Sequence, residues 1–164
     1  MRRKPNPEKI DDEILVFLYK NILLPWENKF HSEKFLMPKK GEGFKGFCID
    51  NDIIIESPTS SPKLQKKLQT FVNESRKVNG LFRFTSYQRT ILKKKETYTV
   101  PKCLLYHLRN SVAHASFGKK VYKGIDYLYF EGWYLGKLKI QAQIKEALVV
   151  DFIKSLVTTK VGVR

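Results

Sequence analysis

Residues 105–114 hold the residue types that metal-free cleavage of a phosphodiester needs. The stretch reads Leu-Tyr-His-Leu-Arg-Asn-Ser-Val-Ala-His, so Arg109 and His114 lie five residues apart and Asn110 follows the arginine. A histidine can move protons near neutral pH, and the planar guanidinium of an arginine can stabilise charge on a phosphate in the transition state. Cleavage of RNA needs both, because one proton leaves the 2′-oxygen while another reaches the departing 5′-oxygen. The pair therefore indicates RNA cleavage.

The predicted helix around these residues decides which side chains can meet. Asn110 and His114 are four residues apart and share a helix face at about 40° separation, and His107 falls near the same line. Arg109 and His114 are about 140° apart around an ideal helix, so they converge only if the arginine reaches round or the helix end loosens. We assign His107, Asn110 and Ser111 supporting roles at this site.

The charge around this stretch argues against a metal site. Between residues 97 and 125 there is no Asp or Glu, whereas Lys102, Lys119, Lys120 and Lys123 all lie there. Enzymes that cleave phosphodiesters with Mg²⁺ or Mn²⁺ hold these ions with clustered carboxylates. We therefore predict no metal and no other cofactor, and we expect these four lysines to bind RNA through its phosphates.

The composition of the whole chain favours a polyanionic partner. The 164 residues include 31 Lys and Arg against 16 Asp and Glu, which gives a formal net charge of +15. No apolar run approaches the roughly 20 residues of a transmembrane helix. The two cysteines are far apart and form no metal or disulfide pattern. We expect one domain over residues 1–164, in the cytoplasm and without membrane contact.

The elements that must position these residues are mostly helices. Apolar residues recur at helical spacing in five segments, which are 8–24, 62–79, 84–95, 99–117 and 141–158. Aromatic residues broken by Gly132 and Gly136 predict a β-hairpin over 125–140. The prolines and glycines of 38–61 predict a loop-rich insertion, in which the apolar run 52–56 fits either a short strand or an extended loop. The predicted fold is therefore mainly α: a helical bundle with a small β-hairpin between the motif helix and the C-terminal helix.

At Arg109 to His114 the sequence resembles the HEPN superfamily of small helical domains, whose signature is an arginine, a polar residue and a histidine a few residues later. The resemblance implies a HEPN-like helical bundle and a metal-independent endoribonuclease of a toxin–antitoxin or phage-defence system. It implies that Arg109 and His114 are the catalytic pair and that Asn110 supports them. It also implies a homodimer in which Arg109 of one chain works with His114 of the partner subunit, together with an antitoxin or another defence protein as a partner.

Two other functions stay open at the level of the sequence. A non-catalytic RNA- or nucleotide-binding module of a defence complex would bind RNA tightly and with strong salt dependence, but would leave its length unchanged. A basic interaction protein would instead bind an acidic protein such as an antitoxin.

Overall fold

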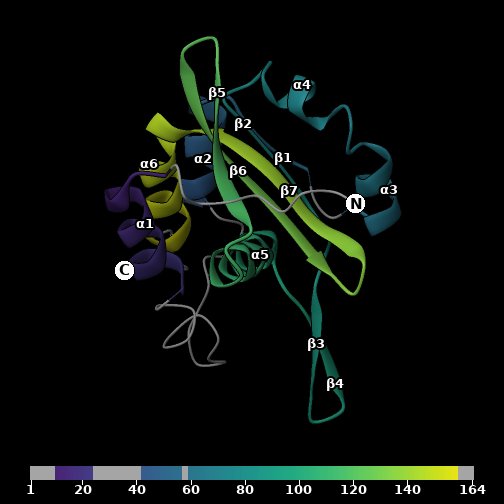
Figure 1. The fold of residues 1–164 in the computed structure, drawn as a ribbon. Coiled ribbons are helices and arrows are strands. Elements are labelled where there is room, and N and C mark those ends of the chain that lie inside the picture. The colour runs from purple at the N-terminus through teal and green to yellow at the C-terminus, as the bar shows by residue number, and fades with distance from the viewer. Residues whose placement is uncertain (1–9, 24–41, 57–58, 159–164) are drawn as a thin grey trace.

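Five strands from three separate parts of the sequence pair into one sheet (Figure 1). The computed structural model describes residues 10–23, 42–56 and 59–158. The strand order is β1-β2-β7-β6-β5, in which β1 and β2 are parallel and the other neighbours are antiparallel. The strands are β1 (Ile53–Glu56), β2 (Gly80–Phe84), β5 (Phe117–Tyr122), β6 (Ile125–Tyr134) and β7 (Lys137–Lys145).

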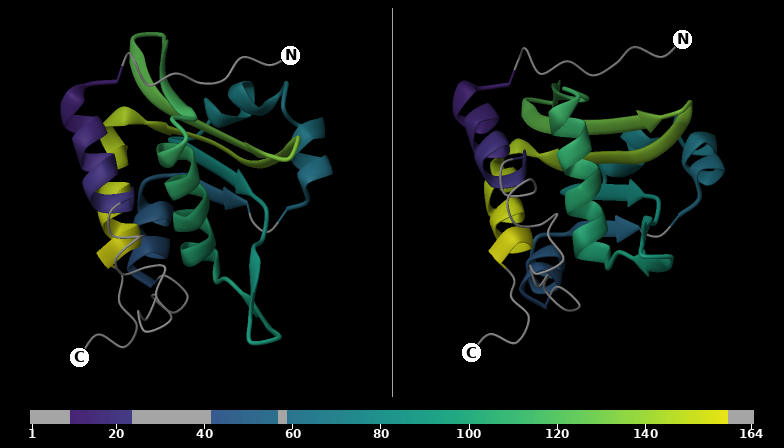
Figure 2. Two further views of the ribbon diagram at one scale, coloured as in Figure 1. Left: turned by 60° about the horizontal axis from the view of Figure 1, so that its bottom comes forward. Right: turned by 90° about the horizontal axis from the view of Figure 1, so that it is seen from below.

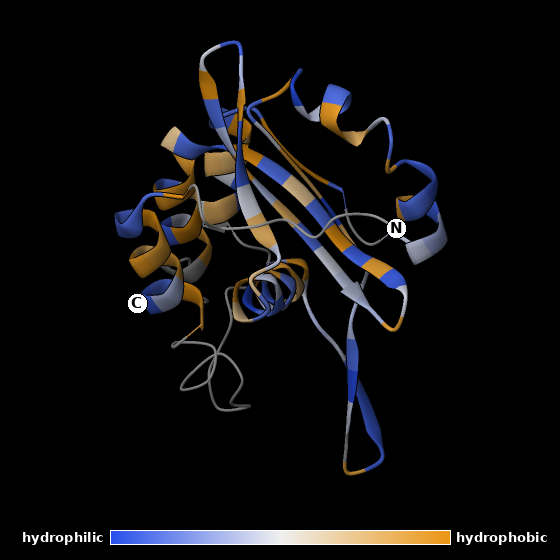
Figure 3. Ribbon diagram, viewed as in Figure 1, coloured by the Kyte–Doolittle hydropathy of each residue, from blue (hydrophilic) through white to orange (hydrophobic). Residues whose placement is uncertain are grey.

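A separate two-stranded ribbon projects from the sheet (Figure 1). In it, β3 (Gln88–Ile91) pairs antiparallel with β4 (Lys94–Thr97). The ribbon is hydrophilic along its strands and apolar at its tip (Figure 3), where Leu92 is exposed. Because an isolated pair of strands buries little apolar surface, the ribbon adds little to the core and extends the surface instead.

Helices pack against the sheet on faces that carry different side chains. Neighbouring residues of a strand point to opposite faces, so Phe82 and Phe84 of β2 face the main core while Leu81 faces a smaller cluster with Phe71 and Tyr129. The helices are α1 (Asp12–Leu18), the π-helix η2 (Tyr19–Leu23), α2 (Glu42–Asp50), α3 (Ser61–Lys66), α4 (Phe71–Ser75), α5 (Val100–Ala113) and α6 (Glu146–Thr158). Figure 2 shows α1, α2, α5 and α6 gathered together, away from α3 and α4. No helix in the described segments is long and apolar enough to span a membrane.

A buried arginine holds the second face of β2. Arg83 donates from Nε to Glu56 at 2.5 Å and from Nη1 to Glu74 at 2.9 Å. Its guanidinium carbon also lies 5.5 Å from the ring centre of Phe71. A buried charge is tolerated only when it is paired, so these contacts explain how β2 can be buried along its whole length and still carry an arginine.

The prediction of a mainly α helical bundle is wrong, because the chain forms a mixed α/β structure around a five-stranded sheet. Residues 84–95, predicted to be helical, instead hold β3 and the start of β4, and residues 141–145 belong to β7 rather than to the last helix. Over such short runs the apolar positions fit a helix or a strand equally well. Pairing with a neighbouring strand decides the backbone.

The loop-rich insertion expected over 38–61 is also absent from the described part of that segment, which holds α2 and β1. There β1 pairs in parallel with β2, a contact between distant residues that no local pattern shows. The helix expected over 62–79 is two short helices, α3 and α4. The motif helix, the hairpin of β6 and β7 and the C-terminal helix are confirmed, with the boundaries given above.

Replacing Phe82 by alanine tests the contact between the sheet and α6. The Phe82 ring is fully buried and stacks on Phe152 with the ring centres 4.6 Å apart. We expect Phe82→Ala to lower the free energy of unfolding by about 3–5 kcal/mol in urea titrations, because the cavity it leaves collapses only partly. The exposed control Val121→Ala should change it by less than about 0.5 kcal/mol. Equal losses in the two variants would contradict this packing.

Candidate functional site

Helix α5 holds the motif residues rigidly because most of its length is buried. Thr99 caps its first turn by accepting a hydrogen bond from the Lys102 backbone N–H, and Pro101 lies at a position where a helix needs no N–H donor. His114 is the residue at the C-terminal cap, and its backbone N–H still donates to the Asn110 carbonyl at 3.0 Å. The predicted motif helix therefore ends at the histidine.

A cavity of about 420 Å³, which we call the α5 pocket, opens beside this helix. Side chains from α5 meet the ends of β6 and β7 and the segment that follows β2. The lining residues are Thr85, Ser86, Tyr87, Tyr106, His107, Asn110, Ser111, His114, Ser116, Gly132, Trp133, Tyr134, Lys139 and Ile140. The structure thus brings four of the five predicted motif residues to one cavity and adds a lysine from β7.

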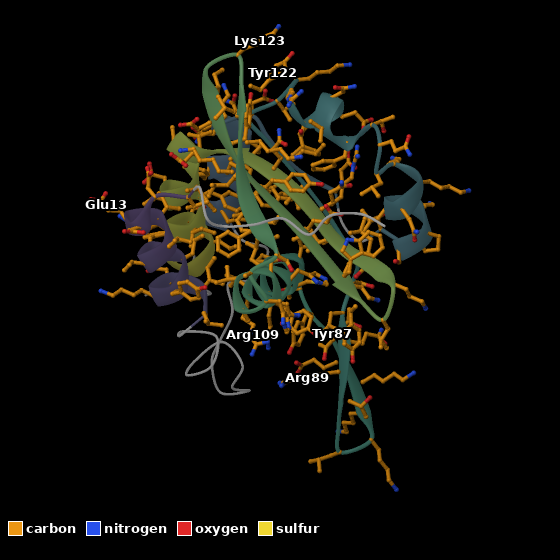
Figure 4. The ribbon with its side chains drawn as sticks, in the orientation of Figure 1. Glu13, Tyr87, Arg89, Arg109, Tyr122 and Lys123 are labelled. Carbon is orange, nitrogen blue, oxygen red and sulfur yellow. The ribbon has the colours of Figure 1, made fainter. Side chains whose placement is uncertain are left out.

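Arg109 is the motif residue that does not line the α5 pocket. Its Nη1 donates to the Asn110 side-chain oxygen at 2.7 Å, so the arginine lies directly behind a residue of the pocket wall. Figure 4 shows Arg109 at the same end of the molecule as Tyr87 and Arg89. Within one chain, the predicted pair of Arg109 and His114 is therefore linked through Asn110 rather than facing across the cavity.

His107 is buried and held in place. Its Nε2 lies 2.8 Å from the Thr85 carbonyl oxygen, and burial lowers the pKa of His107 to about 4. The imidazole is therefore neutral near pH 7, and Nε2 carries the proton because a carbonyl oxygen only accepts. His107 fixes α5 to the segment after β2, which fits a supporting role better than proton transfer.

Ser111 places in the pocket wall a hydroxyl that has no hydrogen-bond partner among the described residues. The residue is 1% exposed, and its Oγ is buried without a hydrogen-bond partner in the described structure. A buried hydroxyl without a partner costs about 1–3 kcal/mol. A bound ligand that hydrogen-bonds this hydroxyl would recover that energy.

Three tyrosines join the pocket to the base of the ribbon. The rings of Tyr87 and Tyr106 stack with centres 4.1 Å apart, and Tyr98 packs on both. Tyr106 forms side-chain hydrogen bonds with Asn110 and Tyr87. Burial raises the pKa of Tyr106, and that of Tyr98 to about 12, so these phenols stay protonated at neutral pH.

The four lysines predicted to bind RNA do not line the α5 pocket. Lys102 is buried over the Tyr98 ring, and Lys119 lies 3.4 Å from both Asp126 and Glu146. Lys120 lies over the ring of Tyr129, and Lys123 lies in the turn between β5 and β6. Contacts with carboxylates or aromatic rings of the same chain therefore already engage most of these four lysines.

Sequence reasoning missed the residues that the sheet brings to the pocket. Tyr106 precedes Asn110 by four residues, so helical spacing could have found it. Trp133, Tyr134 and Lys139 come from β6 and β7, and only the pairing of those strands places them beside α5.

No group of three or more His, Cys, Asp or Glu side chains that could hold a metal ion occurs in the described segments. Cys48 and Cys103 are both buried and free, and burial raises the pKa of each thiol to about 12. Neither cysteine is therefore a thiolate at neutral pH.

Comparisons with protein-family models, with curated proteins and with solved structures gave no match for this chain. The HEPN resemblance therefore stays a prediction that rests on the six residues from Arg109 to His114, since its expected helical bundle is not the observed fold.

The buried state of His107 predicts a measurable acid sensitivity. An unfolded chain takes up a proton on this imidazole near pH 6.5, whereas the folded protein does so only near pH 4. Protonation therefore favours the unfolded state, and stability falls as the pH drops from about 6.5 to about 4, by about 3 kcal/mol at most. We expect urea titrations to show that the stability advantage of the wild type over His107→Gln shrinks across this range. An advantage that does not change with pH would contradict the assignment.

Proposed function

We propose that the α5 pocket binds a nucleotide unit of RNA and cleaves its phosphodiester bond without a metal. The observation that carries the proposal is that Asn110, Ser111 and His114 line one cavity with Lys139, while Arg109 is hydrogen-bonded to the wall of that cavity. The cavity thus offers a titratable imidazole, uncharged hydrogen-bonding groups and a cation within reach of one phosphate. Such a set serves phosphodiester cleavage by proton transfer and charge stabilisation.

His114 is the proton-transfer group in this proposal. It is exposed at the end of α5, and its side chain lines the pocket, so it can reach both substrate and solvent. The 2′-oxygen attacks phosphorus and loses its proton, the bond to the 5′-oxygen breaks, and that oxygen gains a proton. The products are a 2′,3′-cyclic phosphate and a 5′-hydroxyl. Lys139 and Arg109 stabilise the negative charge that builds on the phosphate oxygens.

The place of Arg109 favours a homodimer. Arg109 does not line the pocket of its own chain, and His107 is buried and hydrogen-bonded, so His114 is the accessible imidazole among the described residues of the pocket. In a pair of chains, Arg109 of one subunit would act on a phosphate held at the partner's His114, which takes the proton from the 2′-oxygen and gives one to the 5′-oxygen. The homodimer is therefore part of the proposal.

Aromatic and basic side chains around the pocket suit a single-stranded substrate. Trp133 is 41% exposed and Tyr134 is 66% exposed, which leaves ring faces on which bases can stack. The nearby ribbon carries Lys93, Lys94 and Lys95 around its tip. Its strands continue directly from Tyr87 and Tyr98, which hydrogen-bond to each other through their backbones at 2.9 Å. These cations extend phosphate contacts outward from the pocket.

One observation favours a second candidate, a module that binds RNA or nucleotides without cleaving them. Arg109 does not line the cavity and its Nη1 donates to Asn110, so no guanidinium lines the pocket among the described residues. Such a module would use the same aromatic and basic surface. A setting in toxin–antitoxin or phage-defence systems, and an antitoxin partner, stay predictions of the motif resemblance.

Cleavage in EDTA tests the proposed chemistry. We expect the wild type to shorten single-stranded RNA in EDTA and to leave 2′,3′-cyclic phosphate ends, detected by mass spectrometry. His114→Ala should lower the rate by about 10²–10⁴-fold, because general acid–base catalysis contributes about that much. Lys66→Ala, a change at an exposed residue of α3, should cleave like the wild type. Binding of RNA without cleavage by the wild type would favour the module instead, and equal cleavage by the wild type and His114→Ala would remove His114 from the mechanism.

Mixing two inactive variants tests the homodimer. If Arg109 of one chain acts with His114 of the partner subunit, a dimer of one Arg109→Ala chain and one His114→Ala chain keeps one intact pair. We expect an equimolar mixture, unfolded and refolded together, to recover about a quarter of the wild-type cleavage rate, since half of the dimers are mixed and each holds one of two pairs. A mixture that stays inactive would place both residues in the site of a single chain.

A further inference from the structure

A second cavity, of about 500 Å³, lies near the turn between β5 and β6 and gathers positive charge. We call it the basic hollow, and its charged and aromatic lining residues are Arg76, Lys77, Tyr122, Lys123, Tyr127 and Lys145. Arg76 and Lys77, which follow the end of α4, meet one cation from the β5–β6 turn and one from the end of β7. The fold thus collects four cations from three separate places in the chain.

These cations have no ion pair within the part of the chain that the structure describes. No Asp or Glu side chain lines the basic hollow, and none of Arg76, Lys77, Lys123 and Lys145 forms an ion pair with another residue of the described segments. Like charges held together in a concavity raise the local potential and attract an anion. The arrangement therefore differs from that of Arg83 and Lys119, which each contact two carboxylates.

Arg76 is held by contact with an aromatic ring. Its guanidinium carbon lies 3.7 Å from the ring centre of Tyr122, and Lys123 Nζ lies 5.3 Å from the same ring. A guanidinium that is fixed by stacking and has no ion pair in the described segments is suited to bind phosphate oxygens.

Carboxylates gather in the adjacent cavity. Asp11, Glu13, Asp126 and Glu146 line that cavity, which shares Ile125 and Lys145 with the basic hollow. Asp126 and Glu146 both lie 3.4 Å from Lys119, so they offset the charge of that lysine. Arg76 and Lys123 line the hollow but not the adjacent cavity.

We propose that the basic hollow binds a backbone phosphate of the same RNA strand that enters the α5 pocket. The identity of the ligand as RNA rests on the proposed function, whereas the affinity for phosphate rests on the hollow alone. Tyr127 lines the hollow and Trp133 lines the pocket, six residues further along β6, which is about 20 Å of strand. Figure 4 shows Tyr122 and Lys123 at the opposite end of the molecule from Arg109 and Tyr87. The hollow lies on the α4 face of the sheet and the pocket on the α5 face, so a dinucleotide is too short to reach both sites and a longer strand would pass round the edge of the sheet.

Binding of an uncleavable strand tests the hollow independently of catalysis. A twelve-nucleotide 2′-O-methyl RNA lacks the attacking hydroxyl, so its affinity can be followed by fluorescence anisotropy over a range of salt concentrations. Each phosphate contact contributes about 0.7 to the slope of log K against log salt for a single strand. We expect Arg76→Gln/Lys123→Gln to reduce that slope by about 1.4 relative to the wild type. The control Lys63→Gln/Lys66→Gln removes the same charge from α3 and should change it by less than half as much.

The outcomes separate this proposal from the proposed function. If no RNA is cleaved but the slope still falls as expected, the hollow stands and the proposed function fails. The hollow is overturned if both double variants lower the slope equally, or if the hollow variant loses binding to phosphatidylserine vesicles while its RNA slope stays that of the wild type. Matching melting temperatures would show that both double variants are folded.

Discussion

The packing of α5 on the apolar face of the sheet is the contact on which the candidate site depends. Its fully buried side chains are Leu104, Leu105, Leu108 and Val112. Each buried leucine contributes about 1.5–3 kcal/mol, whereas a partly exposed hydrogen bond such as that from Arg109 to Asn110 contributes about 1 kcal/mol. Apolar burial therefore decides which side of α5 faces the sheet. The polar motif residues lie on the remaining sides of the helix. Asn110 and His114 reach the pocket because they lie on the edge of α5 that the core does not use.

The sheet completes the site that the helix begins. The ends of β6 and β7 bring Trp133, Tyr134 and Lys139 opposite the last turns of α5, and the buried His107 ties the helix to the Thr85 carbonyl. The pocket thus joins a titratable group on a helix cap to aromatic and cationic groups on strand ends. Elements that are each held by the core can keep such groups in place before a substrate arrives, which lowers the cost of ordering them.

The cations that give the chain its net charge of +15 include two kinds. Arg83 and Lys119 each contact two carboxylates and stabilise the fold. Arg76 and Lys123 instead share the ring of Tyr122 without an ion pair in the described segments. A high total charge indicates a polyanionic partner, but only the spatial distribution separates the cations that serve folding from those left to bind a ligand.

The sequence by itself determined the helix that carries the motif, the hairpin after it and the position of Asn110 and His114 on one helix face, because each depends on contacts within a few residues. Helical periodicity and the Thr99–Pro101 start suffice for such elements. The tertiary structure alone decided that β2, β3 and β4 are strands, that β1 joins β2, and that Arg109 donates to the Asn110 side chain without lining the pocket. These features depend on pairing and burial between distant residues. The short apolar patterns of 42–56 and 80–97 fit a helix or a strand equally well, so they do not predict such pairing.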